Sequence, residues 1–218
     1  YLWGNGTLNI DSEGTGLRGG CDSAGYKHLY IGKDVSGTTF NPTIVINATS
    51  GVYGIGIVEF AGGNINVISR PTVSGNAIAA WSMPLIFSGN VNVYAAIIPN
   101  GSGFTSNYVI YTYYSNIVIN GNANLIADAS AIGYVAGAEG RGAVNRDPGN
   151  VPKTGSWDSI YVAYGTATND YSLTVLSDGN NFSGNGFYTP DTNVNIKAGI
   201  KEGYVFDSWS SSHIELIA

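Results

Sequence analysis

A five-residue motif recurs along the chain and narrows the range of possible folds. It reads glycine, asparagine, an apolar residue, asparagine and an apolar residue, and it begins at Gly63, Gly89 and Gly121. Looser copies begin at Thr7 and Thr43. Since successive side chains of a β-strand point to opposite faces, the asparagines of each copy share one face and the apolar residues share the other. The motif therefore predicts a series of equivalent strands, each with one apolar face to bury.

Two further short apolar runs follow the motif strand in each unit. In the clearest unit they lie at 77–81 and 85–87, and in the next unit at 108–113 and 117–119. No stretch repeats apolar residues at helical spacing, so we expect an all-β chain. Three strands per unit, with units of uneven length, are typical of a right-handed parallel β-helix. In that fold each strand stacks on its equivalent one coil below, and the corner loops absorb the differences in length.

The predicted fold is thus a short solenoid of about five coils, followed by a small C-terminal β module. With the motifs in register, Ile65, Val91 and Ala123 lie directly above one another, and the asparagines form amide ladders from coil to coil. We expect 160–163 to add a strand to the last coil. The interval 137–156 is rich in glycine, asparagine and proline, which predicts a long loop.

A different sequence pattern begins at about residue 166. It contains strand-like runs at 171–175 and 193–198, and it ends in Gly-Tyr-Val-Phe-Asp-Ser-Trp at 203–209. This pattern resembles the divergent internalin-type B repeat, a small β-grasp-like module of bacterial surface proteins. The chain departs from the repeat after Trp209, because the following residues lack its usual final strands. The chain is thus expected to have two domains, the parallel β-helix predicted from the repeating strands at 1–165 and, as the resemblance implies, a partial B-repeat module at 166–218.

The predicted coils are similar in their rhythm to the β-helical carbohydrate-binding domains of bacterial surface proteins. Small residues alternate with apolar ones in the same way at 75–79 and 130–133. This resemblance implies an adhesin-like protein that is secreted or held at the bacterial cell surface. The expected partner is a polysaccharide, or a glycan or protein on the surface of a host or neighbouring cell.

The charge balance and the scarcity of certain residues exclude other classes of partner. Nine Lys and Arg against fifteen Asp and Glu give a net charge of −6, which disfavours binding to nucleic acid. A single cysteine and two histidines leave no disulfide framework and no thiolate or histidine-rich metal site. No apolar run approaches the roughly 18 residues of a membrane-spanning segment. We therefore expect no nucleic-acid partner and no membrane span in this fragment.

Acidic residues are almost missing from the predicted coils. Between Asp34 and Asp128 the only carboxylate is Glu59, and the only other charged residue is Arg70. Glycoside hydrolysis needs two carboxylates that flank the bond, and a lyase needs a base together with bound calcium. The sequence therefore predicts a protein without catalytic residues. A polysaccharide lyase or glycoside hydrolase with its acidic groups in the end loops is the alternative.

Acidic residues gather instead near the first coil. Asp11, Glu13 and Asp22 are candidates for a calcium site, because carboxylate and loop carbonyl oxygens are the ligands that calcium prefers. The other interpretation is that they are solvated residues at the end of a solenoid. No calcium nonapeptide and no EF-hand loop is present, and we expect no cofactor apart from this possible calcium ion.

Aromatic residues give the positive signal for binding. Tyrosines crowd one segment, and alternation places Tyr111 and Tyr113 on one strand face and Tyr108 on the other. Exposed Tyr and Trp present a flat apolar ring with a polar edge, which suits sugar rings and protein interfaces. Alternatively, the rings shield the stack or pack beneath the C-terminal module. The candidate ligand-binding residues are Trp81, Tyr94, Tyr108, Tyr111, Tyr113 and Tyr114.

Together these features predict a non-catalytic binding or adhesion module with a glycan as its ligand. Besides the enzyme alternative, a structural one stays open. An uncovered coil end presents unpaired strand edges, and such edges favour self-association into a stalk or filament.

Overall fold

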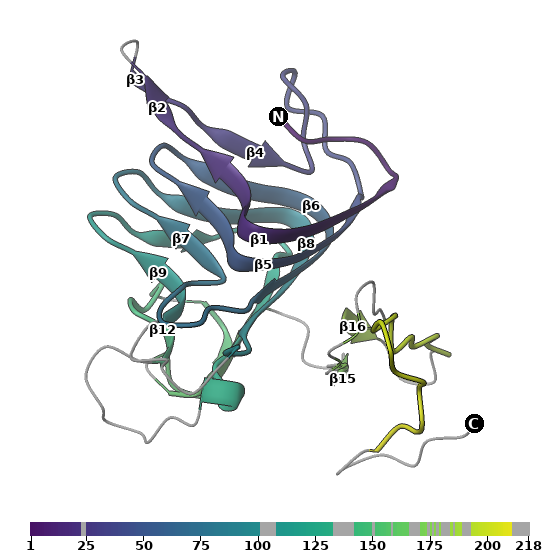
Figure 1. The fold of residues 1–218 in the computed structure, drawn as a ribbon. Helices are drawn as coiled ribbons and strands as arrows, with labels where there is room; N and C mark the ends of the chain where they lie inside the picture. Colours follow the sequence, from purple (N-terminus) through teal and green to yellow (C-terminus); the bar gives the residue numbers. More distant parts are fainter. Residues whose placement is uncertain are drawn as a thin grey trace.

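Figure 1 shows the computed structural model of the chain, which is all-β, as the sequence predicts. The only helical element among the described residues is the single 3-10 turn η1 (Ser130–Ile132). The structure describes residues 1–22, 25–100, 108–132, 142–149, 151–157, 159–165, 171–173, 175, 177, 179, 184, 186–188 and 193–210.

Twelve strands form one curled mixed sheet with the shape of a half-barrel. Two small antiparallel pairs, β2 with β3 and β15 with β16, form separate two-stranded sheets. The strands of the sheet are β1 (Thr7–Gly19), β4 (Leu29–Ile31), β5 (Thr43–Gly54), β6 (Val58–Ser69), β7 (Ile78–Ala80), β8 (Leu85–Ile97), β9 (Tyr108–Thr112), β10 (Ile117–Ile119), β11 (Asn124–Asp128), β12 (Gly142–Val144), β13 (Lys153–Thr154) and β14 (Tyr161–Tyr164). The small pairs are β2 (Cys21–Asp22) with β3 (Gly25–Tyr26) and β15 (Tyr171–Leu173) with β16 (Gly186–Tyr188).

Parallel pairing within the sheet falls into three ladders, in which each pass of the chain lies beside the previous one (Figure 1). The long strands β1 and β5 run from the first ladder into the second, and β6 and β8 run from the third into the first. Equivalent residues are Leu8, Ile44, Ile65, Val93 and Leu125 in the first ladder, Leu17, Val52, Ile78, Ile110 and Val144 in the second, and Leu29, Val58, Leu85 and Ile117 in the third.

The apolar sides of the three ladders meet in one interior cluster. Its largest side chains, Phe60 and Phe87, are register partners in the third ladder and are fully buried. Their ring centroids lie 5.2 Å apart with the planes 8° from parallel. Leu8, Leu17 and Leu29 on the first pass are only partly buried, so the interior is least covered at that end.

The glycine of the recurring motif is explained by its backbone conformation. Gly63, Gly89 and Gly121 have φ angles of 93°, 63° and 67°, in the left-handed region that other residues rarely adopt. At Gly63 a Cβ atom would also lie 2.2 Å from the carbonyl oxygen of Pro42. The motif glycine therefore supplies this left-handed conformation where the chain enters the first ladder, and in β6 and β8 that point lies within a continuous strand.

The asparagines of the motif form the expected amide ladders. Asn92 Nδ2 donates to Asn64 Oδ1 at 3.0 Å, and Asn124 Nδ2 donates to Asn92 Oδ1 at 2.9 Å. A second, shorter ladder joins Asn122 Nδ2 to Asn90 Oδ1 at 3.1 Å. These bonds link the outer surfaces of successive passes, where the backbone alone would leave the side chains free.

The register between two motif copies differs from the one expected. Alignment of the motifs places Ile65 opposite Val91, but the structure places Ile65 opposite Val93, and Val91 opposite Gly63. A shift of two residues keeps every side chain on its face, because strand side chains alternate with a period of two. The pairing also contains an irregularity between Phe60 and Gly62, where β8 has one more residue than β6. The prediction was therefore right about the face to which Ile65 points and wrong about the residue that it pairs with on the next pass.

Two further expectations near residue 150 were wrong. The interval 137–156 was expected to be a loop, yet it contains β12, which pairs in parallel with β9, and β13. Three small residues, Gly142 to Val144, are too short a run to stand out from the surrounding glycines. The segment 160–163 does not continue the parallel stack, because β14 pairs antiparallel with β11 and β13 pairs antiparallel with β14. This reversed pair covers the last pass of the first ladder.

The C-terminal segment contacts the outer side of the first ladder. Ile68 and Val175 form a buried cluster there, and Ile98, Ile196 and Trp209 pack against it. In addition, Arg70 donates through its guanidinium to the carbonyl oxygen of Ser177 at 2.7 Å, while Nε donates to Asn47 Oδ1 at 2.7 Å. The strand-like run at 193–198 forms only an isolated bridge, and residues 203–209 form no strand.

Removal of a core ring tests the packing. Since Phe87 is fully buried against Phe60, we expect Phe87→Ala to lower the free energy of unfolding by about 3–5 kcal/mol. Chemical denaturation measures this loss. Val35 is 79% exposed, so the control Val35→Ala should change the free energy by less than about 0.5 kcal/mol. Equal losses in the two variants would contradict the packing described here.

Candidate functional site

Four aromatic side chains gather where strands of the second ladder end. Trp81 directly follows β7, and Tyr113 directly follows β9. The ladder continues through them, since the Trp81 N–H donates to Gly54 O at 2.8 Å and the Tyr113 N–H donates to Ala80 O at 3.0 Å. Equivalent residues on paired strands lie about 4.8 Å apart, which is close to ring-stacking distance. The two ring centroids are accordingly 4.2 Å apart, with the planes 2° from parallel.

Tyr114 stands at a right angle to this stack. Its ring plane makes angles of 87° with Tyr113 and 85° with Trp81, at centroid distances of 4.2 and 6.2 Å. Its backbone N–H donates to Trp81 O at 2.9 Å, which fixes its position in the ladder. Tyr114 is 69% exposed, against 40% for Trp81 and 37% for Tyr113. Tyr114 therefore offers the largest free ring surface, and the stacked pair supports it from behind.

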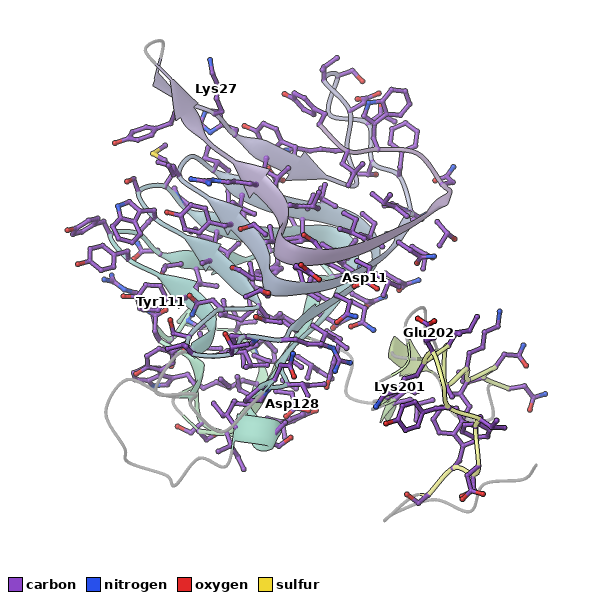
Figure 2. The ribbon with its side chains drawn as sticks, in the orientation of Figure 1. Asp11, Lys27, Tyr111, Asp128, Lys201 and Glu202 are labelled. Carbon is purple, nitrogen blue, oxygen red and sulfur yellow. The ribbon has the colours of Figure 1, made fainter. Side chains whose placement is uncertain are left out.

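Tyr111 completes the group that we call the aromatic patch, namely Trp81, Tyr111, Tyr113 and Tyr114. Tyr111, labelled in Figure 2, is half-buried. Its ring centroid is 6.1 Å from that of Tyr113. Tyr108 lies beside the patch, with its ring centroid 6.2 Å from Tyr111. The strand-face expectation separated Tyr108 from Tyr111, but their rings are near neighbours at the edge of β9.

Two residues that the sequence did not single out hold the end of β9 in place. The Asn145 side chain accepts from the Thr112 N–H at 2.9 Å and donates to Thr112 O at 2.7 Å, as a neighbouring strand would. Arg146 then donates to Tyr113 O at 2.8 Å. Both residues directly follow β12. Recognition of 142–144 as a strand in the sequence would therefore have pointed to them.

Tyr94 lies elsewhere and is not part of the patch. It is 3% exposed and belongs to a cluster with Ala96 and Ile126 on the outer side of the first ladder. Its hydroxyl donates to Asp128 Oδ2 at 3.0 Å. For this residue the alternative interpretation, in which a ring shields the stack, describes the observed position.

The lone carboxylate of the central strands has structural partners. Glu59 forms an ion pair with Lys33, and its Oε1 accepts from Ser88 Oγ at 2.9 Å. Both contacts join the third ladder to neighbouring passes. Within the described residues, this carboxylate is therefore engaged in packing interactions.

The candidate calcium ligands lie along and beyond β1. Asp11 Oδ1 is 3.5 Å from Asn47 Nδ2, and the Glu13 carbonyl oxygen accepts from Thr49 Oγ1 at 2.8 Å. The side chain of Asp22 lies outside the described residues. Among those described, no group of three or more His, Cys, Asp or Glu side chains comes together in a way that could hold a metal ion. The calcium site stays a prediction.

Comparison with family models, curated proteins and solved structures found no match to this chain. In the described part of the chain, no helix has the length and apolar character needed to cross a membrane.

The pKa of the Tyr114 hydroxyl depends on the arrangement of the patch. Its side-chain hydrogen bond with Tyr113 raises the pKa of Tyr114 above the ordinary value, and desolvation raises it further. The neutral form is thus favoured in the folded state. This contribution to stability is complete below pH 10 and is lost as the pH rises through the raised pKa.

Replacement of the partner hydroxyl tests this arrangement. We expect Tyr113→Phe to move the pKa of Tyr114 down toward the ordinary tyrosine value, because the hydrogen-bond partner is lost. NMR titration with ring-labelled tyrosine measures the pKa, and Tyr114→Phe assigns the signal. Tyr26 is 53% exposed on β3, so Tyr26→Phe is the control and should leave Tyr114 unchanged. An unaltered titration in Tyr113→Phe would show that the two hydroxyls do not interact.

Proposed function

We propose that this protein is a non-catalytic binding module and that its aromatic patch holds a glycan. The observation that carries the proposal is the exposed group formed by Trp81, Tyr113 and Tyr114. Sugar rings have apolar C–H faces that pack on aromatic rings and hydroxyl groups that bond to polar edges. Tyr114 supplies the exposed ring, and the stacked pair holds it in place before a ligand arrives. Such preorganisation lowers the entropic cost of binding.

The same proposal includes the architecture. We regard the three ladders as the three sides of successive coils in a right-handed parallel β-helix of about five coils, residues 1–165. Supporting this, one pass contributes equivalent residues to each ladder, for instance Ile65, Ile78 and Leu85. Residues 166–218 would then be the partial module similar to an internalin-type B repeat. The packing of Trp209 against the cluster of Ile68 and Val175 is the observation that bears on how this module is held.

The setting that we propose is extracellular, at a bacterial cell surface or in secreted form. An adhesion protein there meets polysaccharides and the glycans or proteins of host and neighbouring cells. The resemblance of 203–209 to the surface-protein repeat is the basis for this setting. Glu59, engaged with Lys33 and Ser88, gives no support to the lyase or hydrolase alternative.

Self-association is the second candidate, and the unpaired edge of β1 favours it. In the described sheet β1 pairs only with β5, so the other edge of this thirteen-residue strand is free to pair. Sedimentation velocity over a range of concentrations separates the two candidates, since a stalk or filament unit sediments faster as concentration rises.

A glycan array with three variants tests the binding proposal. We expect Tyr114→Ala and Trp81→Ala each to weaken binding by about 1–2 kcal/mol, roughly five- to thirtyfold in Kd, because a stacking surface or its support is lost. Trp3 is 57% exposed and packs at a tilt against Phe40 away from the patch, so Trp3→Ala is the matched control and should bind like the parent. Binding to no glycan, or equal binding by all variants, would refute the proposal.

A further inference from the structure

Two arginines, Arg18 and Arg146, lie at opposite ends of the surface that Tyr53 and the aromatic patch form on the second ladder. Along the outer side of the second ladder, Arg18 is opposite Tyr53, Tyr53 is opposite Ala79, and Ala79 is opposite Tyr111. The Arg18 guanidinium carbon is 5.6 Å from the centre of the Tyr53 ring. Ala79 between the tyrosines is small, lies outside the interior cluster and is covered by its neighbours, with only 5% exposed. This column therefore begins with a cation and continues with aromatic rings.

The neighbouring column ends with the second arginine. Trp81 stacks on Tyr113, and Arg146 donates to the Tyr113 carbonyl oxygen. Arg146 is exposed, and one bond to a carbonyl leaves most of its five N–H donors for other acceptors. Four strand steps separate β1 from β12, which is about 19 Å along the stack. That length corresponds to an oligosaccharide chain and exceeds a single sugar.

No carboxylate of the described residues forms an ion pair with either arginine. Asp147 is next in sequence to Arg146, but its carboxylate pairs with Lys153 and accepts from the Gly149 N–H at 3.1 Å. Lys153 and this bond lower the pKa of Asp147. Asp11 and Asp128 belong to the first ladder, away from Tyr111 (Figure 2). The two guanidinium groups are thus available to an outside anion.

We propose that the aromatic patch selects anionic polysaccharides, with Arg146 and Arg18 binding acidic groups of one chain laid along the second ladder. The inference rests on the glycan-binding function proposed above and names its ligand class. Arginine suits this role because its planar fork bonds carboxylate or sulfate through two parallel N–H groups. The net charge of −6 repels a polyanion from the surface at large, so attraction depends on this local pair of cations.

Binding of matched polymers tests the inference. Polygalacturonate and its methyl ester share one backbone and differ in charge, and dextran sulfate and dextran do the same for sulfate. We expect the full chain to bind at least one acidic polymer about tenfold or more tightly than its neutral counterpart, with affinity falling as salt is added. The pair that shows the difference identifies carboxylate or sulfate as the group bound.

Variants then assign the effect to the arginines. Arg146→Gln should weaken acidic binding about tenfold while neutral binding changes little, and Arg146→Lys should restore part of it. Arg18→Gln tests the far end without touching the Tyr113 carbonyl bond. Lys197→Gln removes an exposed cation from the C-terminal segment and is the control of equal charge change. Thermal unfolding shows that each variant is folded.

The outcomes separate the two proposals. Equal binding of acidic and neutral polymers, or losses in both arginine variants no larger than in Lys197→Gln, would overturn the preference for anions and leave glycan binding intact. Absence of binding to every polymer would overturn both. A salt-sensitive acidic preference that Arg146→Gln and Arg18→Gln reduce would support the inference.

Discussion

The parallel pairing of each pass with the one before it is the constraint on which the rest of the molecule depends. Because paired strands hold equivalent residues about 4.8 Å apart, the side chain at one position contacts the side chain at the equivalent position on the next pass. Inside, this places Phe60 on Phe87. Outside, it places Asn64 beside Asn92 and Trp81 beside Tyr113. Core, amide ladder and aromatic stack are three consequences of one spacing.

The aromatic patch shows how a repetitive scaffold produces a unique site. Backbone hydrogen bonds of the ladder fix the positions of Trp81 and Tyr113. These positions therefore do not depend on contacts between the rings of the patch. Asn145 and Arg146, arriving from β12, complete the edge of β9 with side chains where a further strand would use its backbone. Residues that could take part in binding thus lie just past the strand ends. Side chains there do not have to fill the apolar interior, so they can differ from one pass to the next.

Sequence reasoning succeeded where the signal was local and failed where it depended on distant partners. The motif strands, their apolar faces and the asparagine ladders follow from alternation and from glycines that require a positive φ. The register of Ile65 was wrong by two residues because a shift of two leaves every side chain on its face, so the alternating pattern alone does not distinguish the two registers. β12 was missed because its three residues gain their identity as a strand only from β9.

The sequence by itself determined that the chain is all-β and which side of each central strand is apolar, since these properties depend on neighbouring residues alone. It also identified the aromatic residues worth attention. Only the tertiary structure decided which of them form a surface: Tyr94 is buried beside Asp128, whereas Trp81, Tyr113 and Tyr114 meet in the open. The physical reason is that exposure depends on which pass lies alongside and what covers it. Pairing between residues far apart in the sequence sets both.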